Sequence, residues 1–515
     1  MKNFTYLQGA FILTITNLIT GIISFAYRIF LTKSIGAEGI GVYQLVIPLY
    51  YLFITLVSGG LATSISKLVA ENRVKYIYSN INKIIKVSII LSAIWSIIFS
   101  AAIAINAEFL ANYVLKDNRT TYSIIVFSPA IVFIALSSVL KGYFYGMDKV
   151  SIPAIIDIAE KFVRLVFLII TTSYFINYGI EYVCAGAMMA MVLGEILSLI
   201  LLIIPYKKNK SNINSQKQTV SSLSIVKNIL ITFIPLSISS SINNIMDMTD
   251  AVLIPSQLEK AGFSKEYSIS MYGELTGMIM PLLYFPLIII GSLSTTLIPS
   301  IAYSYASGNY IALNKKCNDS ITISSVIGFA CSIIFITYPT ELCQVLFNYP
   351  EAGTLLFWSA FPCLFEYWLF TLIAIMNGMS LQKKVLECSF VNIFIMSLSI
   401  ILLMPIPKLN IYAYLIGFAL SSPLIVLRSI SIISKNTPIR FDMKKSVIKP
   451  FLCSIPMLIT IKSINNYLIT NTSAQYNMIL SYWAGLIIYF IMLFITGALK
   501  PKQLINVLKI NSKVE

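Results

Sequence analysis

The feature that most constrains this chain is a succession of apolar stretches, each long enough to cross a membrane. A helix needs about 20 residues to span the hydrocarbon core, and the sequence contains fourteen such stretches. Charged residues make up only 11% of the 515 residues, whereas soluble domains average about 25%. The sequence therefore predicts an all-α integral membrane protein. Its predicted spans lie near residues 6–29, 41–66, 85–106, 121–141, 152–176, 182–205, 226–249, 273–299, 319–338, 354–378, 386–405, 410–433, 447–468 and 478–499.

The positive charge of the chain is unevenly distributed between its loops. The net charge is +16, which by itself could suggest a nucleic-acid partner. If the N-terminus is cytoplasmic, however, 26 basic residues fall on the cytoplasmic side and six on the other. This is the positive-inside bias of membrane proteins. We expect a multi-pass protein of a plasma membrane with both termini in the cytoplasm, anionic lipids as partners, and no nucleic-acid partner.

The chain also carries signs of an internal duplication. A polar linker at 206–225 follows the sixth span, and "GGLATS" at 59–64 resembles "GSLSTT" 232 residues later. At the same offset, "GM" at 146–147 recurs at 378–379. Two matches at one offset indicate two parallel six-helix repeats, an arrangement found in transporters. The predicted bundles are 1–205 and 226–435, and 436–515 adds two transmembrane helices and a cytoplasmic tail.

Signatures of enzymes are scarce in this sequence. It contains no histidine, which excludes HExxH zinc sites and histidine-based triads. No P-loop motif is present either, so the chain does not hydrolyse ATP by that route. We expect a protein that is not an enzyme, with no cofactor and no metal site. A coupling cation is left open.

Charged residues inside a predicted span are candidates for function because they are costly in the membrane. The fifth span, "PAIIDIAEKFVRLVFLII", places Asp157, Glu160, Lys161 and Arg164 on one helical face. This spacing predicts two ion pairs, Asp157–Lys161 and Glu160–Arg164. The face either lines a cavity or lies near the cytoplasmic headgroups, where long side chains can reach water. Glu160 and Arg164 are the deeper pair and the better candidates for a cavity.

Two further spans contain polar residues of interest. In the seventh span, Asn243, Asp247 and Asp250 share one face. That face is a candidate cation site, proton acceptor or sugar-binding edge, or simply the amphipathic outer end of a helix. Arg28 closes the first span and Glu274 opens the eighth, where prolines at 281 and 286 are expected to interrupt the helix. The isolated acids Glu195 and Glu366 favour local packing or interhelical hydrogen bonds.

Three stretches resemble the stage V sporulation protein B branch of the polysaccharide-export flippases. They are "IGAEGIGVYQLVIPLYYLFITLVSGGLATSISKLVAEN" (35–72), "LKGYFYGMDKVSIPAIIDIAEKFVRL" (140–165) and the segment 254–309 that contains "SMYGELTGMIMPLLYFPLIIIGSLSTTLIPS". The similarity extends over essentially the whole chain. The branch belongs to the multidrug/oligosaccharidyl-lipid/polysaccharide exporter superfamily.

This resemblance implies a V-shaped pair of six-helix bundles that work by alternating access. It also implies a central cationic cavity for a lipid-linked pyrophosphate sugar, serving peptidoglycan, spore-cortex or other polysaccharide synthesis in a bacterium. Related flippases hold the pyrophosphate with arginines on the first, second and eighth spans. Arg28 is the first-span counterpart, and Lys67 and Arg164 are expected to replace the other two. Cell-wall synthesis enzymes are candidate partners.

Two other functions stay open at this point. A cation-coupled drug exporter of the same superfamily would depend on the acids Asp247, Asp250 and Glu274 and would tolerate loss of Arg28 and Arg164. A non-transporting scaffold for wall synthesis would tolerate neutralisation of all these residues.

Overall fold

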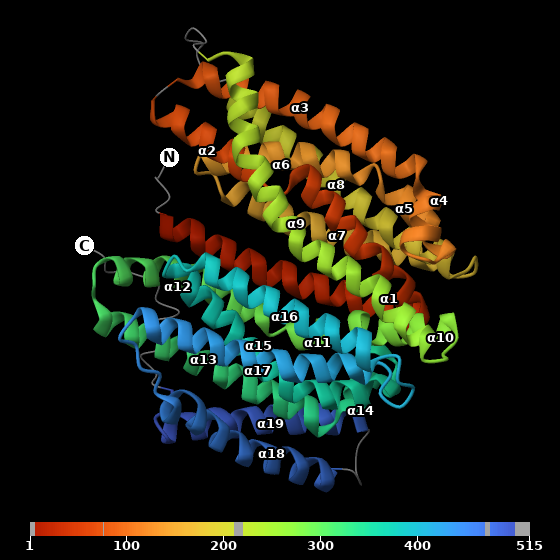
Figure 1. Ribbon diagram of the computed structural model, residues 1–515, viewed down its shortest axis with the longest axis vertical. Helices are drawn as coiled ribbons and strands as arrows, with labels where there is room; N and C mark the ends of the chain where they lie inside the picture. The colour runs from red at the N-terminus through yellow and green to blue at the C-terminus, as the bar shows by residue number, and fades with distance from the viewer. Residues whose placement is uncertain (1–5, 76, 211–219, 469–473, 500–515) are drawn as a thin grey trace. The chain divides into compact units, whose positions relative to one another are not determined.

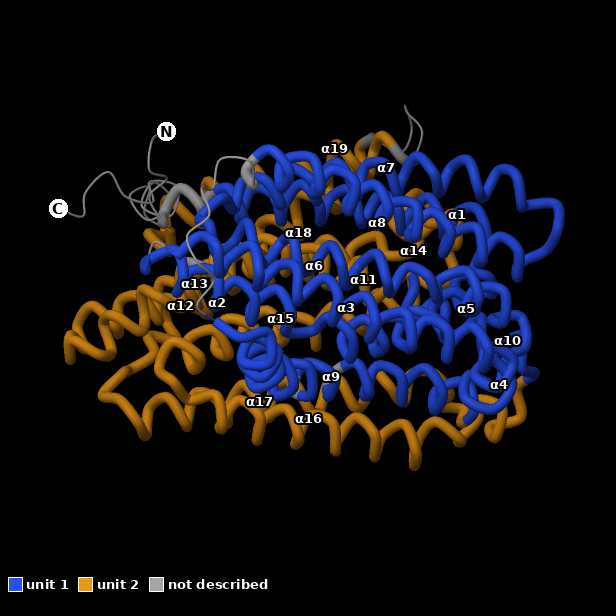
Figure 2. The backbone as a smooth tube through the Cα atoms, turned by 90° about the horizontal axis from the view of Figure 1, so that it is seen from above, with its two compact units in different colours: residues 1–256, 264–277 blue, residues 257–263, 278–515 orange. Residues whose placement is uncertain are grey.

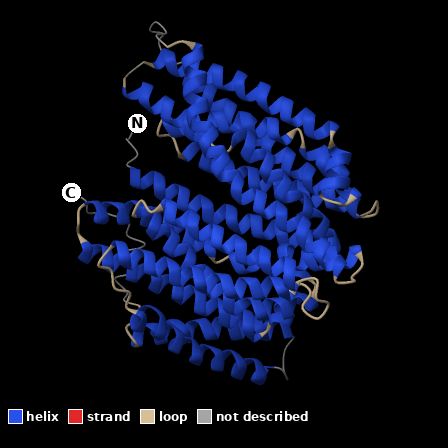
Figure 3. Ribbon diagram, viewed as in Figure 1, coloured by secondary structure: helices blue, strands red, loops and turns tan. Residues whose placement is uncertain are grey.

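The computed structural model describes residues 6–75, 77–210, 220–468 and 474–499. Helices and short connections account for this part of the chain, and no strand occurs in it (Figure 3). Twelve of the described helical segments are long and apolar enough to cross a membrane. The first of them, Ile12–Val74, has 63 residues and covers the first two predicted spans. The predicted all-α membrane fold is confirmed, whereas the count of fourteen spans stays a prediction.

The chain divides into two compact units, which Figure 2 colours separately. Unit 1 comprises residues 1–256 and 264–277, and unit 2 comprises 257–263 and 278–515. The helical segments of unit 1 comprise the α-helices labelled in Figure 1 and two short segments, η1 and η2. They are α1 (Tyr6–Ser58), α2 (Leu61–Val74), α3 (Tyr78–Ile105), α4 (Ala107–Phe109), η1 (Leu110–Val114), η2 (Asn118–Thr120), α5 (Thr121–Phe127), α6 (Ala130–Gly146), α7 (Ser151–Phe175), α8 (Ile180–Lys210), α9 (Ser222–Lys260) and α10 (Lys265–Gly273).

A π-helical turn, η3 (Glu274–Ile279), follows α10, and unit 2 continues from it. The helices of unit 2 are α11 (Met280–Tyr284), α12 (Leu287–Ala306), α13 (Tyr310–Thr337), α14 (Pro339–Phe347), η4 (Pro350–Ala352), α15 (Gly353–Gly378), α16 (Gln382–Leu403), α17 (Tyr412–Asn436), η5 (Lys444–Ile448), α18 (Lys449–Leu468) and α19 (Ala474–Ile495). The break between α11 and α12 falls at Phe285 and Pro286, as the prolines predicted.

Helix α1 is two helices joined at Gly36. The backbone there has φ 67° and ψ −170°, which is not helical, and this combination is essentially restricted to glycine. The two red segments of α1 meet at the right-hand end of Figure 1. Beside the bend, Arg119 Nη1 donates to Glu38 Oε1 at 2.5 Å and Arg119 Nη2 donates to Asp117 Oδ2 at 2.7 Å. Gly36 thus separates the first two predicted spans.

The predicted bundle boundary at 206–225 does not coincide with the boundary between the units. Helix α9 was expected in the second bundle, but its residues up to Ser256 belong to unit 1. The reason is apolar packing: Ile225, Ile229 and Phe233 of α9 join the same buried cluster as Leu61 of α2. The central part of the predicted linker, 211–219, lies outside the described residues. The four predicted domains stay a prediction.

The internal duplication is visible in matching contacts within each unit. Helix α6 packs on α2 in unit 1, and α15 packs on α12 in unit 2. A Cβ on Gly146 would lie 2.7 Å from the Ser66 carbonyl oxygen and 2.7 Å from Val69 Cβ. A Cβ on Gly378 would lie 2.9 Å from the Ile298 carbonyl oxygen and 2.8 Å from Ile301 Cβ. The contacted residues in unit 2 are thus displaced by the same 232 positions as the glycines.

The ends of the two helices match as well. The residue after each glycine is a methionine, with φ −89° and ψ 6° in unit 1 and φ −87° and ψ 7° in unit 2. The next residue is left-handed in both units, with φ 55° at Asp148 and 60° at Ser380. This agreement supports the repeat that the sequence indicated.

The last two helices, α18 and α19, pack on α13 of unit 2. Met457 and Ile461 of α18 share a buried cluster with Val326 of α13. Tyr489 of α19 is fully buried, and its hydroxyl donates to the Val326 carbonyl oxygen at 3.2 Å. These two helices correspond to the pair expected after the second repeat.

Candidate functional site

Helix α7 carries the charged face that the sequence singled out. Glu160 and Arg164 are buried, with relative exposures of 3% and 8%. The Arg164 guanidinium donates through Nη2 to Glu160 Oε1, one helical turn away. The predicted Glu160–Arg164 ion pair is therefore confirmed.

Arg164 has a second carboxylate partner on the neighbouring helix. Its Nη2 donates to Glu195 Oε1 of α8 at 2.9 Å. Gly194 of α8 faces Arg164 at this point, since a Cβ on it would lie in van der Waals contact, 3.4 Å from both Cβ and Nε of Arg164. The expectation that Glu195 makes an interhelical hydrogen bond is confirmed. Glu195 was not among the predicted site residues, although its position as an acid at membrane depth was a signal for it.

The second predicted pair, Asp157–Lys161, is wrong. Asp157 Oδ1 accepts instead from Lys141 Nζ of α6 at 2.7 Å. Lys161 Nζ donates to Glu160 Oε1 at 3.4 Å. The physical reason is that α6 supplies a closer cation to Asp157 than its own helix does. Lys141, assigned to a cytoplasmic loop, lies within α6, five residues before the end of that helix at Gly146.

Together these six residues form a charge cluster that is electrically balanced. Its members are Lys141, Asp157, Glu160, Lys161, Arg164 and Glu195, three bases and three acids. Moving one isolated ion from water into an apolar medium costs on the order of 20 kcal/mol by the idealised Born estimate. The ion pairs within the cluster offset this cost. They also mean that its basic side chains are already bound to carboxylates. Arg164 in particular already binds two carboxylates.

Arg28 of α1 differs from Arg164 because no ion pair recorded for the described residues includes it. Both guanidiniums keep one buried nitrogen without a hydrogen-bond partner among the described residues, Nε in Arg164 and Nη1 in Arg28. The adjacent Tyr27 donates its hydroxyl to the Ala187 carbonyl oxygen at 3.2 Å, and no bond recorded for the described residues joins it to Arg28. A buried guanidinium donor without a partner is unusual, and it suits a ligand that brings its own negative charge.

Lys67 stands apart from both arginines. It is exposed on α2, and no ion pair recorded for the described residues includes it. The structure therefore leaves Lys67 as a free surface cation in unit 1.

The polar face of the seventh span lies on α9. Asn244 Nδ2 donates to Thr55 Oγ1 of α1 at 2.6 Å, while the side chain of Asn243 is outside the described part of the chain. Asp247 is exposed and Asp250 partly so. Both aspartates and Arg28 influence Tyr272 of α10 electrostatically. The structure thus relates Arg28 to the α9 acids through Tyr272.

Glu274 is at the junction of α10 and η3 and is partly exposed. The segment that carries it is held on α1, because Gln44 Nε2 donates to the Thr276 carbonyl oxygen at 2.8 Å. The structure therefore brings Glu160 and Arg164 together in the balanced charge cluster of α6–α8. Arg28, Asp247 and Asp250 are related through Tyr272, whereas Lys67 stands apart.

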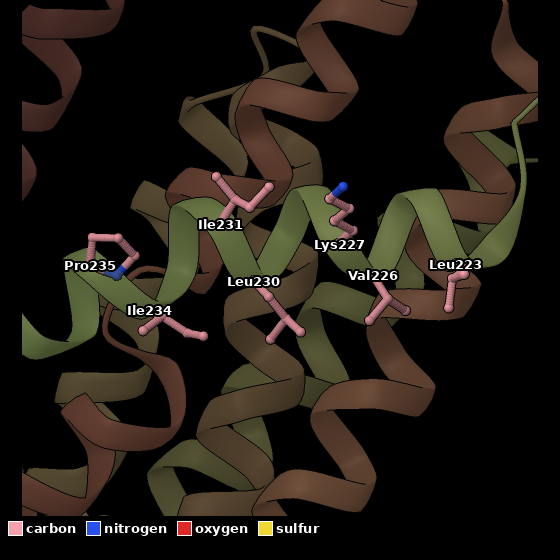
Figure 4. Close-up of a pocket in the computed structure, with 7 residues that line it drawn as sticks. All are labelled: Leu223, Val226, Lys227, Leu230, Ile231, Ile234 and Pro235. Carbon is pink, nitrogen blue, oxygen red and sulfur yellow. The ribbon is translucent and has the colours of Figure 1, made fainter.

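An open groove along α9 is shown in Figure 4. Its lining residues all come from that helix and are apolar apart from Lys227: Leu223, Val226, Lys227, Leu230, Ile231, Ile234 and Pro235. None of the predicted site residues lines it. The groove therefore belongs to the apolar surface of α9 and not to the candidate site.

Comparison with known proteins places this architecture in a family. The model of the family described as "Polysaccharide biosynthesis protein" matches residues 6–304. The chain belongs to the polysaccharide biosynthesis protein family. This family assignment confirms the resemblance found in the sequence.

Individual relatives extend the match to nearly the whole chain. It is 28% identical to stage V sporulation protein B of Bacillus subtilis (strain 168), over 98% of both chains. It is 26% identical to the lipid II flippase MurJ of the same organism, covering 78% of this chain and 77% of that one.

Solved structures show the same fold at lower identity. A lipid II flippase MurJ in an inward closed conformation superposes with a TM-score of 0.71 at 15% identity, covering 96% of this chain and 99% of that one. An inward-facing multidrug resistance MATE family transporter of the MOP superfamily gives 0.63 at 15% identity, covering 83% and 98%. The chain therefore has the fold of these transporters and is a multi-pass membrane protein.

Proposed function

We propose that this protein is a flippase that moves a lipid-linked cell-wall oligosaccharide outward across the plasma membrane by alternating access. The observation that carries the proposal is Arg28, whose buried Nη1 lacks a protein partner among the described residues. The similarity to a stage V sporulation protein B and to a lipid II flippase supports this substrate class, a precursor of peptidoglycan, spore cortex or another polysaccharide.

The chemistry of such a substrate suits a guanidinium. A pyrophosphate group presents several oxygens, and the planar guanidinium fork can donate two parallel hydrogen bonds to them. Because the medium around a membrane-depth site has a low dielectric constant, each of these charge-assisted bonds is stronger than in water. We assign Arg28 as the main phosphate contact and Lys67 as an accessory cation nearer the surface.

The remaining predicted residues have supporting roles in this proposal. The α9 acids Asp247 and Asp250, with Asn243 and Glu274, would line the path of the sugar hydroxyls, to which carboxylates and amides can hydrogen-bond. The pair Glu160–Arg164 would shape the cytoplasmic half of the path. Its cations are neutralised in this structure, so it would bind phosphate only if Glu160 or Glu195 released Arg164.

In the predicted topology, outward transport starts from the cytoplasmic side. With both termini in the cytoplasm of a bacterial cell, the substrate enters from the side that carries most of the basic residues. The moving bodies would be the two predicted six-helix bundles. We expect the protein to transport its substrate without changing it chemically, with anionic lipids around it and cell-wall synthesis enzymes acting before and after it.

The test is a flipping assay with a fluorescently labelled lipid-linked precursor in liposomes. Wild type should flip it, Arg28→Ala should lose most of the activity, and Arg28→Lys should retain part of it because the charge remains without the fork. Equal flipping by wild type, Arg28→Ala and Arg164→Ala would overturn the assignment of these residues. A folded wild type that flips no precursor would overturn the substrate class.

The second candidate, a cation-coupled drug exporter, is favoured by one observation, the fold shared with a multidrug resistance transporter. If the protein is such an exporter, Asp247→Asn and Asp250→Asn should abolish transport, whereas Arg28→Ala should leave it intact. The flippase proposal expects the reverse for Arg28→Ala. A scaffold would show no transport in any variant.

A further inference from the structure

Unit 2 contains an acid in the middle of a transmembrane helix. Glu366 lies on α15, 13 residues after its first residue, Gly353, and 12 before its last, Gly378. At a rise of 1.5 Å per residue it is roughly 20 Å from the start of the helix. The Ser422 hydroxyl of α17 donates to Glu366 Oε1 at 2.6 Å. Ser422 is fully buried, so the contact is made inside the bundle at mid-depth.

No cation compensates Glu366 in the described part of unit 2. The ion pairs recorded there join Glu387 to Lys384 and to Arg428, away from α15. Lys316 of α13 is bound elsewhere, since its Nζ donates to the Ser300 carbonyl oxygen and to Ser304 Oγ.

The other titratable groups around α15 do not supply a positive charge either. On α15 itself, Cys363 and Tyr367 both donate to the Leu283 carbonyl oxygen. Helices α11 and α12 contain tyrosines but no Asp, Glu, Lys or Arg. The charged residues of α13, α14, α16 and α17 lie within two to three turns of a helix end. The group that faces Glu366 from α17 is therefore a neutral hydroxyl.

An ionised carboxylate in this position would be strongly unfavourable. A charge buried without a counter-ion neutralises by binding a proton. The acids of the unit 1 charge cluster illustrate the alternative, since Asp157, Glu160 and Glu195 each contact a cation. Glu366 has the single hydrogen bond from Ser422 instead, which satisfies one oxygen and leaves the other free to carry a proton.

The duplication shows that this acid is not required by the packing of the repeat. At the 232-residue offset, Ile134 and Ala190 occupy the positions of Glu366 and Ser422 in unit 1. Two apolar residues can therefore fill this place in an equivalent bundle. The acid and its hydroxyl partner are present in unit 2 alone, and polar groups at membrane depth mark function by default.

We infer that Glu366 is a proton-binding site, neutral in this conformation, which releases its proton to water when the bundle rearranges during transport. Glu366 is partly exposed, and the proposed release requires water to reach this exposed part during the rearrangement. The link to transport rests on the proposed flippase function, whereas the proton-binding site itself does not.

Infrared spectroscopy of the full chain in liposomes tests the site without any substrate. Wild type at neutral pH should show the C=O stretching band of a protonated carboxylic acid, and Glu366→Gln should lose it. Ser422→Ala should keep the band but shift it, because the carbonyl oxygen loses its donor. Glu387→Gln, which removes a paired and exposed acid of the same unit, is the matched control and should leave the band unchanged. If folded Glu366→Gln loses no band, Glu366 is ionised and the inference is overturned.

Flipping of labelled precursor under an imposed pH gradient tests the link to transport. Gln is isosteric with the neutral acid, so Glu366→Gln should still fold. Wild-type flipping should respond to the gradient, and the response should vanish in Glu366→Gln while persisting in Glu387→Gln. A wild type that flips equally with and without the gradient would overturn the coupling. A wild type that flips nothing would instead overturn the proposed function, and the infrared result would still decide the proton site.

Discussion

The two units use the same backbone packing but hold very different charges. Gly146 and Gly378 make the same close helix contacts 232 residues apart. The charged face of α7, however, has no counterpart in α16, where the residues equivalent to Asp157, Glu160, Lys161 and Arg164 are Ser389, Asn392, Ile393 and Met396. Leu427 likewise stands where unit 1 has Glu195. The duplicated bundle thus folds with or without ions in this place, so the charge cluster of unit 1 is an addition to the packing and not its basis.

The largest expected effect comes from removing Arg164 alone. Arg164→Met leaves Glu160 and Glu195 buried without their main counter-ion, and breaking a buried ion pair in this way costs about 3–5 kcal/mol. We expect a correspondingly large loss in the free energy of unfolding, measured by denaturant titration in detergent. Met396→Ala at the equivalent position of unit 2 is the control and should cost less, because it removes packing only. Equal losses would show that Arg164 acts as an apolar spacer.

Transplanting the unit 2 residues into unit 1 sharpens this comparison. The quadruple variant Glu160→Asn, Lys161→Ile, Arg164→Met, Glu195→Leu removes two acids and two bases together and leaves the Lys141–Asp157 pair in place. Replacing a buried ion network by packed neutral residues is often neutral for stability, so the quadruple variant should recover most of the stability lost in Arg164→Met. A quadruple variant no more stable than the single one would mean that the network itself holds the bundle together.

The shared glycine contacts should respond alike in both units. Gly146→Ala and Gly378→Ala each place a Cβ under 3.0 Å from a backbone oxygen of the facing helix. Overpacking of this kind costs about 1–3 kcal/mol, and thermal unfolding should report similar losses for the two variants. Gly291→Ala is the control, since its Cβ would meet only the Phe370 ring at 3.6 Å or beyond. A loss confined to one unit would contradict the structural equivalence of the repeats.

Double-mutant cycles can measure whether Asp157 interacts more strongly with Lys141 or with Lys161. Lys141→Met with Asp157→Asn should show a coupling of about 0.5–3 kcal/mol, as groups in contact do. Lys161→Met with Asp157→Asn should show less coupling, because Lys161 contacts Glu160. If Lys161 couples to Asp157 more strongly than Lys141 does, the Asp157–Lys161 pair expected from helical spacing would be correct after all.

The smallest effect is expected at the exposed ion pairs of unit 2. Glu387 bridges Lys384 and Arg428 with more than 40% of each side chain exposed. Surface pairs contribute about 0–1 kcal/mol, so Glu387→Gln should barely change the unfolding midpoint, and added salt should erase the difference. A loss as large as that of Arg164→Met would contradict the contrast between the two units.

Helical spacing was sufficient to predict some of the site and not the rest. The Glu160–Arg164 pair follows from positions four residues apart on one helix, and it is present. The partners of Asp157 and the second partner of Arg164 come from α6 and α8, and the sequence contains no local signal for which residues of two distant helices will meet. The matching motifs at one offset, in contrast, predicted the repeat because the same glycine contact recurs in each copy.

By itself the sequence determined the class of this protein, since no water-soluble core accommodates so many apolar spans, and helical periodicity placed four charges on one face. Only the tertiary structure decided which charged side chains of this protein are paired with an opposite charge. Arg164 is bound by two carboxylates, Arg28 keeps a buried nitrogen without a partner among the described residues, and Glu366 has a hydroxyl for its neighbour. The physical reason is that the free energy of a buried charge depends on the groups that surround it in space, and these come from helices far apart in the chain.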